Sequence, residues 1–302
     1  MKLIESSVEI LPQEEGLLGA YKQIEKAGRV CYKSEDKICE GSAKKMVDFL
    51  IGRGHFSPLE HGTIYLHFSY CSPMNDANYT KLVNIRLFYE KNPYSKVVIR
   101  TEDNYKMDVY ITSNCRVITE HNRQNDLQYM CEPTKHHKKR VTIKAICDRG
   151  VTHEWVRHRT ESFCQESTRY CNYSKDKFGM SVTFIQPSWV KEEHQEEFEE
   201  DCALFEALYF KWLNKGYIPQ YARYFLNTGV KTELVATAFI DDWKHFFDLR
   251  CSTAAHPDIK VLADDHISRQ IQRIQPMKRA VLLNQVGCTV DKFQRNRPII
   301  QA

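Results

Sequence analysis

Apolar and polar residues follow two different spacings along the first half of the chain. Alternation of the two classes predicts strands over residues 3–11, 62–70 and 140–147. Apolar residues three and four apart predict a helix over 16–28, and a second helix follows Ser42. Between 71 and 139 the pattern is less regular, and it predicts one helix over 80–92 and a strand near Tyr110.

The second half of the chain reads as mainly helical. A long acidic amphipathic pattern predicts a helix over 191–214, and shorter patterns predict helices over 219–227, 231–250 and 257–275. A strand is predicted at SVTFIQP, ahead of the long helix. Strands and helices mix without a repeating strand–helix–strand unit, so the expected fold class is α+β.

Composition narrows the class of protein. The chain has 302 residues and a mass of 35.5 kDa, with 42% hydrophobic and 27% charged residues, which excludes wholesale disorder. No apolar run reaches the roughly 18–20 residues that cross a bilayer, and the start MKLIESSVEILPQEEG turns polar too soon for a secretory signal. The expected location is therefore the cytoplasm, with no membrane partner.

Cysteines and charge add two expectations. The eleven cysteines include no C-x-x-C pair, so they are predicted to be reduced and mostly buried, with no metal site. A net charge of +4 permits anionic small molecules without requiring a nucleic-acid partner. The basic bend KHHKKR at 135–140 is interpreted as a solvated loop, or else as a rim that attracts polyanions such as a folate or NADPH.

Residues 153–170, HEWVRHRTESFCQESTRY, carry the candidate chemistry. The segment holds Arg157, Arg159 and Arg169 among histidines, hydroxyls and a glutamine, with almost no apolar periodicity. Guanidinium groups donate two parallel hydrogen bonds to a phosphate. The segment follows a buried-looking strand and a glycine, where connections tend to form sites. These residues together predict a nucleotide cradle.

Other phosphate and metal motifs do not fit. A zinc protease needs two histidines four apart on one helix face, but His153 and His158 are five apart and therefore lie on different faces. The chain has neither a P-loop nor a G-x-G-x-x-G sequence. A dinucleotide would have to be held by side-chain donors instead.

Arg157-His158-Arg159, followed after seven residues by Ser167 and then Arg169-Tyr170, resembles the signature of the flavin-dependent thymidylate synthases, the ThyX family. Supporting likenesses are Glu60-His61 before a strand, the entry DRGVTHEWVRHR, Tyr221-Ala222-Arg223, and Leu249-Arg250 followed by His256. The likeness covers about 41–70 and 140–270. Cys164 and Gln165-Glu166 depart from the family's usual residues, as do Phe239 and His245, where the family often has asparagines.

The resemblance implies a fold and a reaction. It predicts one catalytic domain over 1–302, with a mixed, largely antiparallel sheet and flanking helices, an insertion at about 71–139 and a basic extension at 277–302. It implies that the chain methylates dUMP to dTMP, with methylenetetrahydrofolate as carbon donor and FAD, reduced by NADPH, as hydride donor. It also implies a homotetramer whose active sites are shared between subunits.

The resemblance also assigns site residues. The cofactor-binding residues it implies are His61, Arg157, His158, Arg159, Thr160, His245 and His256. The substrate-binding residues it implies are Glu154, Gln165, Glu166, Ser167, Arg169, Tyr170, Arg223 and Arg250. The catalytic residues are expected to be Arg250, Ser167 and Arg169, with Arg250 stabilising charge on a pyrimidine carbonyl while Arg169 and Arg223 anchor the nucleotide.

Three alternatives stay open. A Cys164 thiolate, activated by nearby arginines, could add to the uracil ring, although a structural or site-lining cysteine is favoured. A protein that binds single-stranded nucleic acid could use Arg169, the KHHKKR bend, the basic tail and interleaved aromatics. A flavin-binding relative that has lost methylation is the third.

Overall fold

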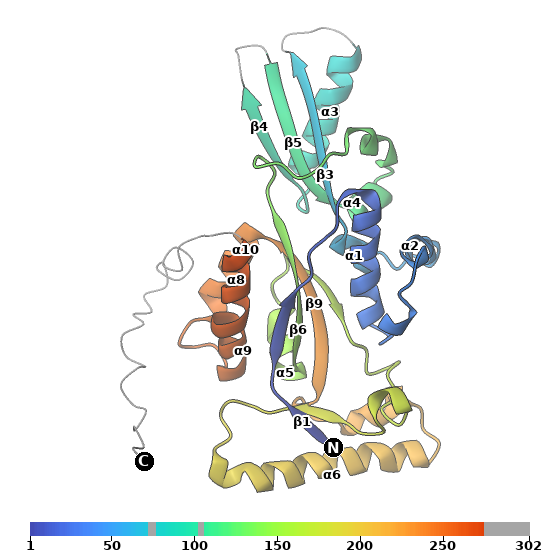
Figure 1. Cartoon of the computed structure of the whole chain (residues 1–302), viewed down its shortest axis with the longest axis vertical. Helices are drawn as coiled ribbons and strands as arrows, with labels where there is room; N and C mark the ends of the chain where they lie inside the picture. The colour runs from blue at the N-terminus through green and yellow to red at the C-terminus, as the bar shows by residue number, and fades with distance from the viewer. Residues whose placement is uncertain (72–76, 102–105, 275–302) are drawn as a thin grey trace.

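The structure is a computed structural model that describes residues 1–71, 77–101 and 106–274 (Figure 1). Its strands are β1 (Lys2–Ile4), β2 (Ser7–Ile10), β3 (Thr63–Cys71), β4 (Lys96–Thr101), β5 (Lys106–Asn114), β6 (Arg140–Asp148), β7 (Ser162–Gln165), β8 (Thr183–Ile185) and β9 (Lys231–Phe239). Its α-helices are α1 (Gly16–Val30), α2 (Ser42–Gly52), α3 (Ala77–Lys91), α4 (Cys115–Glu120), α5 (Arg149–Trp155), α6 (Gln195–Asn214), α7 (Pro219–Ala222), α8 (Ile240–Arg250), α9 (Pro257–Val261) and α10 (Ser268–Ile274).

Antiparallel pairing dominates the two larger sheets. The central sheet has the strand order β2-β6-β9-β7, and the second sheet has the order β3-β5-β4. Every neighbouring pair in these two sheets is antiparallel, whereas the short pair β1–β8 is parallel. The prediction of an α+β fold with a mixed, largely antiparallel sheet and flanking helices is confirmed.

Strand β9 corrects the prediction of a single helix over 231–250. Residues Lys231–Phe239 form a central strand between β6 and β7, and the helix begins only at Ile240. Eight of the nine strand residues are buried, because the strand has helices on both sides. A strand that is buried on both faces has no alternation of apolar and polar residues, so its run of apolar residues resembles a helix.

Alternate residues of β9 contact helices on opposite faces of the central sheet (Figure 1). Ala236 belongs to the core that contains Trp243 and Phe246 of α8. Val235 lies in a smaller cluster with Ala27 of α1, on the other face. The central sheet is thus enclosed between α1 and the C-terminal helices. This packing fixes the ends of its strands, where the loops begin.

The second sheet extends beyond the central one and has a core of its own. Figure 1 shows β3, β4 and β5 with α3 alongside them at the upper end of the molecule. Ile64, Leu66, Ile85 and Ile111 are buried in this core. The strand β4 was not predicted from the sequence, whereas the predicted helix after residue 80 and the strand near Tyr110 are confirmed as α3 and β5.

The basic bend at 135–140, just before β6, makes buried contacts with the rest of the protein, unlike a solvated loop. His137 is 5% exposed, and its Nδ1 accepts a hydrogen bond of 3.1 Å from the Thr134 backbone N–H. Its Nε2–H therefore donates to the Leu66 carbonyl oxygen, at 3.1 Å. The interpretation of His137 as a solvated residue is wrong, because β3 supplies it with a buried acceptor.

The remaining elements complete the described part of the chain. Helix α6 lies across the lower end of the molecule in Figure 1, and its Tyr209 shares a third core with Phe184. Of the ten cysteines described, six are buried and none forms a disulfide. Among the described helices, none is both long and apolar enough to span a bilayer. The basic extension predicted at 277–302 lies outside the described residues.

Candidate functional site

The arginine-rich motif begins where α5 ends. Asp148 caps this helix by accepting a hydrogen bond of 2.8 Å from the Val151 backbone N–H, and the helix stops at Trp155. The turn that follows leaves Arg157 and Arg159 exposed, and neither side chain makes an ion pair with another described residue. Two uncompensated guanidinium groups thus flank His158, which is buried.

Arg250, at the last residue of α8, joins α5 and the turn after it. Its Nη1 donates to Glu154 Oε2 at 2.8 Å, and its Nη2 donates to the Glu154 carbonyl oxygen at 2.6 Å. Its Nε donates to His158 Nε2 at 3.0 Å. A guanidinium has five N–H groups, so two remain for a ligand. Glu154, His158 and Arg250, all predicted site residues, are therefore brought together from distant parts of the sequence.

The Arg250 bond fixes the protonation of His158. Arg250 Nε is always a donor, so His158 Nε2 must accept and the ring proton resides on Nδ1. Burial and the adjacent Arg250 charge lower the pKa of His158 to about 4, which keeps the ring neutral at pH 7. Its Nδ1 lies 4.0 Å from Glu161 Oε1.

Glu161 is a buried carboxyl group beside the motif that the sequence analysis did not single out. Trp155 Nε1 donates to its Oε2 at 2.9 Å, while its Oε1 has no hydrogen-bond partner among the described residues. Burial raises the pKa of Glu161 to about 8. No pattern around position 161 distinguishes this acid from a surface residue, so only the packing of α5 against α8 reveals it.

We expect Glu161→Gln to stabilise the protein at pH 8 but not at pH 4.5. In the unfolded chain the carboxyl group ionises near its ordinary pKa of 4.5, whereas the folded protein keeps it protonated to about pH 8. The folded state therefore holds a proton that the unfolded state has lost, and stability falls as pH rises through this interval.

Urea denaturation at both pH values measures this effect. The free energy of unfolding of Glu161→Gln, relative to that of the wild type, should rise by at least about 1 kcal/mol from pH 4.5 to pH 8. Glu193→Gln, at an exposed position, is the matched control and should show no such gain. An equal difference between Glu161→Gln and wild type at both pH values would contradict the assignment.

A second group of predicted residues lies after β7. Arg169 Nη2 donates to Gln220 Oε1 at 3.4 Å, and Arg223 Nη1 donates to Thr168 Oγ1 at 3.3 Å. Ser167 holds the turn, since its Oγ accepts from the Arg169 backbone N–H at 3.3 Å. The turn after β7 thus places Arg169 and Arg223 on the same part of the surface, both of them exposed.

Tyr170, Gln165 and Glu166 have different surroundings. Tyr170 is 58% exposed, and its ring lies 5.2 Å from that of Tyr32. Gln165 Nε2 donates to Thr152 Oγ1 at 2.9 Å, so its amide faces α5. Glu166 is buried and accepts a hydrogen bond of 2.8 Å from Lys231 Nζ. The structure therefore places Glu166 in an internal ion network rather than beside Arg169.

The predicted cofactor residues do not all meet. His245 is exposed, with its ring centroid 5.8 Å from that of His158. Thr160 makes a hydrogen bond with Asp242 at the start of α8. His256 caps α9 and lines, with Glu154, a pocket of about 290 Å³.

His61 is the exception among the predicted cofactor residues. It is fully buried, and its Nδ1 lies 2.7 Å from Thr237 Oγ1 on β9. Burial and the nearby Arg140 charge lower the pKa of His61 to about 3, so the ring is neutral. His61 thus lies against β9 and the Phe163 backbone of β7, and among the described residues it makes no hydrogen bond or ion pair with residues 157–160.

The family model of the thymidylate synthase complementing proteins, Thy1, matches residues 17–76 and 132–277, which together make up more than half of the chain. The chain belongs to the Thy1 family. This result confirms the family resemblance carried by Arg157-His158-Arg159 and Ser167. The matched segments contain the Arg250 cluster and the Arg169 turn of this Thy1 chain.

Curated relatives of this Thy1 chain are named flavin-dependent thymidylate synthases. The protein from Pyrococcus furiosus is 34% identical over 119 residues, which are 39% of this chain and 48% of that protein. The protein from Sulfurisphaera tokodaii is 30% identical over 158 residues, which are 50% of this chain and 56% of that protein. The chain therefore spans about half the length of the curated relatives it matches.

A solved structure, the UMP/dUMP methylase PolB from Streptomyces cacaoi bound with 5-Br dUMP, covers 91% of this Thy1 chain and 91% of that chain. Its sequence identity to this chain is 17% and its TM-score is 0.40.

Residues 77–131 lie between the two segments that match the family model. They include α3, β4, β5 and α4 of the upper part of the molecule.

Cys164 does not have the surroundings of a nucleophile in this Thy1 chain. It is 3% exposed and lies in the cluster between α1 and β9. A hydrogen bond with the Cys31 thiol and complete burial raise its pKa well above 9, so the thiol is protonated at neutral pH. The structure favours the structural role for Cys164.

In an assay of thymidylate synthesis, the activity for which its relatives are named, Cys164→Ala should stay within about threefold of wild type, because a protonated buried thiol is not a nucleophile. The measurement is the initial rate at saturating substrates, with Cys202→Ala as the control, since Cys202 is equally buried in the third core. A loss of more than about 10³-fold with Cys164→Ala alone would restore the thiolate mechanism.

Proposed function

We propose that this Thy1 chain is a flavin-dependent thymidylate synthase that methylates dUMP to dTMP. The observation that supports this most strongly is the Arg250 cluster. A guanidinium bound to Glu154 and His158 keeps two N–H groups free, beside a turn that carries two uncompensated arginines. The printed names of the Pyrococcus and Sulfurisphaera relatives support the same activity.

The proposed substrate site uses the two groups of arginines for different parts of dUMP. Arg169 and Arg223 suit the dianionic phosphate, and the backbone and hydroxyl of Ser167 hold their turn in place. Arg250 suits a pyrimidine carbonyl oxygen, where negative charge develops when uracil C5 attacks the methylene donor. Ser167, Arg169 and Arg250 are the residues we propose to be essential for the reaction.

The other predicted substrate-binding residues have less direct roles in the proposed site. Gln165 and Glu166 are proposed to shape the substrate site from behind, since their side chains already bind Thr152 and Lys231. Tyr170 offers an exposed ring edge beside Arg169, whose guanidinium lies 5.3 Å from the ring centroid. A base or ribose can pack there.

The side chains around the Arg157 turn fit an FAD molecule. Arg157 and Arg159 suit its diphosphate, because both are exposed and neither is paired with a described carboxylate. The neutral ring of His158 lies in this turn with Thr160, and the ring of His245 lies beside it, so these three side chains can bind polar atoms of the flavin. His256 lines the neighbouring pocket with Glu154 and would meet a more distant part of the cofactor. When bound, a flavin reduced by NADPH would supply the hydride that converts the methylene group taken from methylenetetrahydrofolate into the methyl group.

The proposal also covers assembly and the insertion. We propose a homotetramer with shared active sites, in which the exposed Arg157 and Arg169 turns meet a second subunit. We also propose that the upper sheet, built largely from residues outside the family match, is an insertion into one catalytic domain.

Two measurements on the purified chain test the proposal. The protein should be yellow, and addition of NADPH should bleach the flavin absorbance. With methylenetetrahydrofolate present, it should release tritium from [5-³H]dUMP in a dUMP-dependent manner and form dTMP. Bleaching without tritium release would identify a flavin-binding relative that has lost methylation, and would contradict the proposed synthase.

Binding to single-stranded nucleic acid is the alternative that the same protein sample tests. A colourless protein whose affinity for a single-stranded oligonucleotide falls steeply with salt would favour it. The family match and the relatives named above are those of thymidylate synthases, and none of them supports this alternative.

A further inference from the structure

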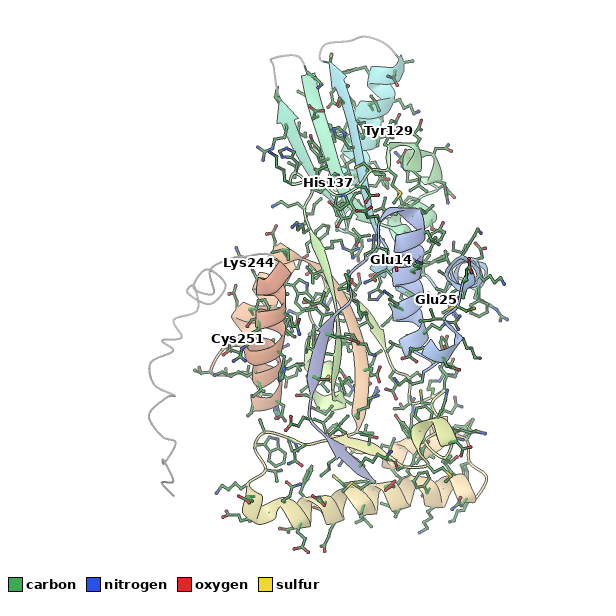
Figure 2. The ribbon with its side chains drawn as sticks, in the orientation of Figure 1. Glu14, Glu25, Tyr129, His137, Lys244 and Cys251 are labelled. Carbon is green, nitrogen blue, oxygen red and sulfur yellow. The ribbon has the colours of Figure 1, made fainter. Side chains whose placement is uncertain are left out.

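A strongly basic pocket lies between the upper sheet and α8, away from the Arg250 cluster. It has a volume of about 360 Å³ and is bordered by β4, by the bend before β6 and by the first turn of α8. Its charged lining residues are Arg100, Lys135, Lys138, Lys139, Lys244 and Asp241. Figure 2 shows Lys244 at the upper end of α8, on the side of the molecule where His137 marks the base of the upper sheet.

The positive charges that line this pocket outnumber the carboxylates that pair with them among the described residues. Asp241 is the acid of the lining, and it pairs with Lys138 at 3.3 Å. Arg100, Lys139 and Lys244 make no ion pair with another described residue, and the same is true of Lys135. Positive charges held near one another repel, and an anion bound among them removes that repulsion.

Contacts that leave the lysine side chains free hold the pocket in shape. His137 is buried and anchors the bend through Thr134 and Leu66. The Ile240 backbone N–H donates to the Lys139 carbonyl oxygen at 3.1 Å, which ties the bend to the start of α8. The cations therefore project from a fixed scaffold, which lowers the entropy lost when a ligand binds.

The position of the pocket relative to Arg250 indicates what kind of ligand fits. Lys244 and Arg250 are both on α8, and at 1.5 Å of rise per residue they are about 9 Å apart along its axis. A molecule of ordinary cofactor size spans that distance. Val98 and Arg100 of β4 lie outside the segments that the family model matches, whereas the rest of the lining lies within them, so β4 adds one wall to a pocket otherwise built from matched residues.

We propose that this basic pocket binds the oligoanionic part of a co-substrate whose reacting end lies toward Arg250. The second half of this statement rests on the proposed function; the binding of an oligoanion does not. Two sources share the chemistry: the phosphates of a reduced nicotinamide dinucleotide, and the carboxylates of a γ-glutamyl chain on a folate. Both present several negative charges a few ångströms apart.

Calorimetric titration of the full chain with inorganic tripolyphosphate, at about 50 mM salt, tests the pocket itself. The double variant Arg100→Gln/Lys139→Gln should bind tripolyphosphate at least about tenfold more weakly than wild type. The control Arg53→Gln/Lys45→Gln removes the same charges from exposed positions on and just after α2 and should stay within about twofold of wild type.

Equal weakening in both double variants, or no binding by wild type, would overturn the proposal. So would binding of a single-stranded oligonucleotide without binding of tripolyphosphate. All four substituted side chains are exposed, and coincident urea denaturation curves would show that a loss of binding is not a loss of fold.

Displacement of bound tripolyphosphate distinguishes the two sources. Displacement by NADPH, with at least about tenfold weaker displacement by NADH, identifies the phosphate source. Displacement by tri-γ-glutamyl but not monoglutamyl methylenetetrahydrofolate identifies the carboxylate source. If neither co-substrate displaces tripolyphosphate, the co-substrate assignment is wrong. None of these titrations requires turnover, so a protein that binds in this way but releases no tritium from dUMP would refute the proposed synthase and leave the pocket intact.

Discussion

Replacing Arg250 with alanine is expected to lower the rate of dTMP formation by at least about 10²–10³-fold, the loss seen when one preorganised donor to a developing charge is removed. Arg250 binds Glu154 twice and His158 once, at 2.6–3.0 Å. Its guanidinium is therefore oriented before any substrate arrives. Alanine would remove the donor and also leave the Glu154 carboxylate without its cation.

The lysine variant separates charge from geometry. Arg250→Lys keeps the positive charge but has one nitrogen in place of three, so it cannot bind Glu154 and His158 and also face a pyrimidine carbonyl. We expect it to recover at most a small part of the lost rate. The measurement is tritium release from [5-³H]dUMP at saturating substrates, with flavin content determined for each variant.

Arg53→Ala provides the control, because Arg53 is exposed just after α2 and its guanidinium contacts only the ring of Phe49 among the described residues. Its rate should equal that of wild type. A near-normal rate for Arg250→Ala or Arg250→Lys would end the assignment of Arg250. A lost rate with lost flavin would instead indicate that Arg250 acts by holding the His158 turn, which is a positioning role.

Glu233→Gln is expected to have the largest effect on stability. Glu233 is buried on β9 and contacts three lysines: it accepts from Lys33 Nζ, from Lys231 Nζ at 2.6 Å, and lies 3.1 Å from Lys144 Nζ. Lys231 keeps the buried Glu166 as a partner, but Lys33 and Lys144 would keep only Glu35 and Glu9, whose side chains are more exposed. Without Glu233 these two part-buried lysines therefore lose their buried carboxylate. We expect a loss of about 3–5 kcal/mol in the free energy of unfolding at pH 7.

The same network predicts how stability depends on acid. Burial by itself would raise the pKa of Glu233, but the Lys231 and Lys33 charges outweigh it and lower the pKa to about 2. In the unfolded chain the ordinary value is 4.5, so between about pH 4.5 and pH 2 the unfolded state binds a proton that the folded state does not. The contribution of Glu233 is therefore complete above pH 4.5 and is lost as the pH falls through about 2.

Urea denaturation from pH 7 down to pH 3 checks both statements. The difference between wild type and Glu233→Gln should be largest at pH 7 and should shrink as the pH falls below 4.5. Glu9→Gln is the matched control, because Glu9 also pairs with Lys144, at 3.5 Å, but its side chain is 60% exposed. It should cost no more than about 1 kcal/mol. A Glu233→Gln variant as stable as Glu9→Gln would show that the lysines are adequately solvated without the carboxylate.

Local sequence patterns identified some of the strands and helices and missed others. The alternation over 140–147 and the helical spacing over 16–28 identified β6 and α1 because each element faces a core on one side and solvent or a polar layer on the other. The strand β9 escaped detection for the opposite reason, since it is buried on both faces. β7 escaped because it is only four residues long, with a polar residue at each end, inside the polar segment that carries the site.

The family was recognised from the spacing of Arg157 to Ser167 together with the likenesses at Glu60-His61, Tyr221-Ala222-Arg223 and Leu249-Arg250, each of which lies within a short continuous segment. Local patterns do not predict hydrogen-bond and ion-pair partners that are far apart in the sequence. Arg250 and His158 are 92 positions apart, and Lys33 and Glu233 are 200 apart. Nothing in the local sequence around either residue specifies its partner, because the pairing depends on which strands are neighbours.

The amino-acid sequence by itself thus determined the fold class, the family and the segment that holds the candidate chemistry. Local spacing is sufficient for these, because a helix face, a strand and a short motif are each formed within a few residues of one another. Only the tertiary structure decided that Arg250 binds Glu154 and His158, that Glu161 is a buried acid and that His61 is enclosed. It also decided that one pocket is lined by four cations that make no ion pair with the part of the chain that the structure describes. Burial and charge balance depend on chain segments that meet only after folding, so they are properties of the assembled molecule.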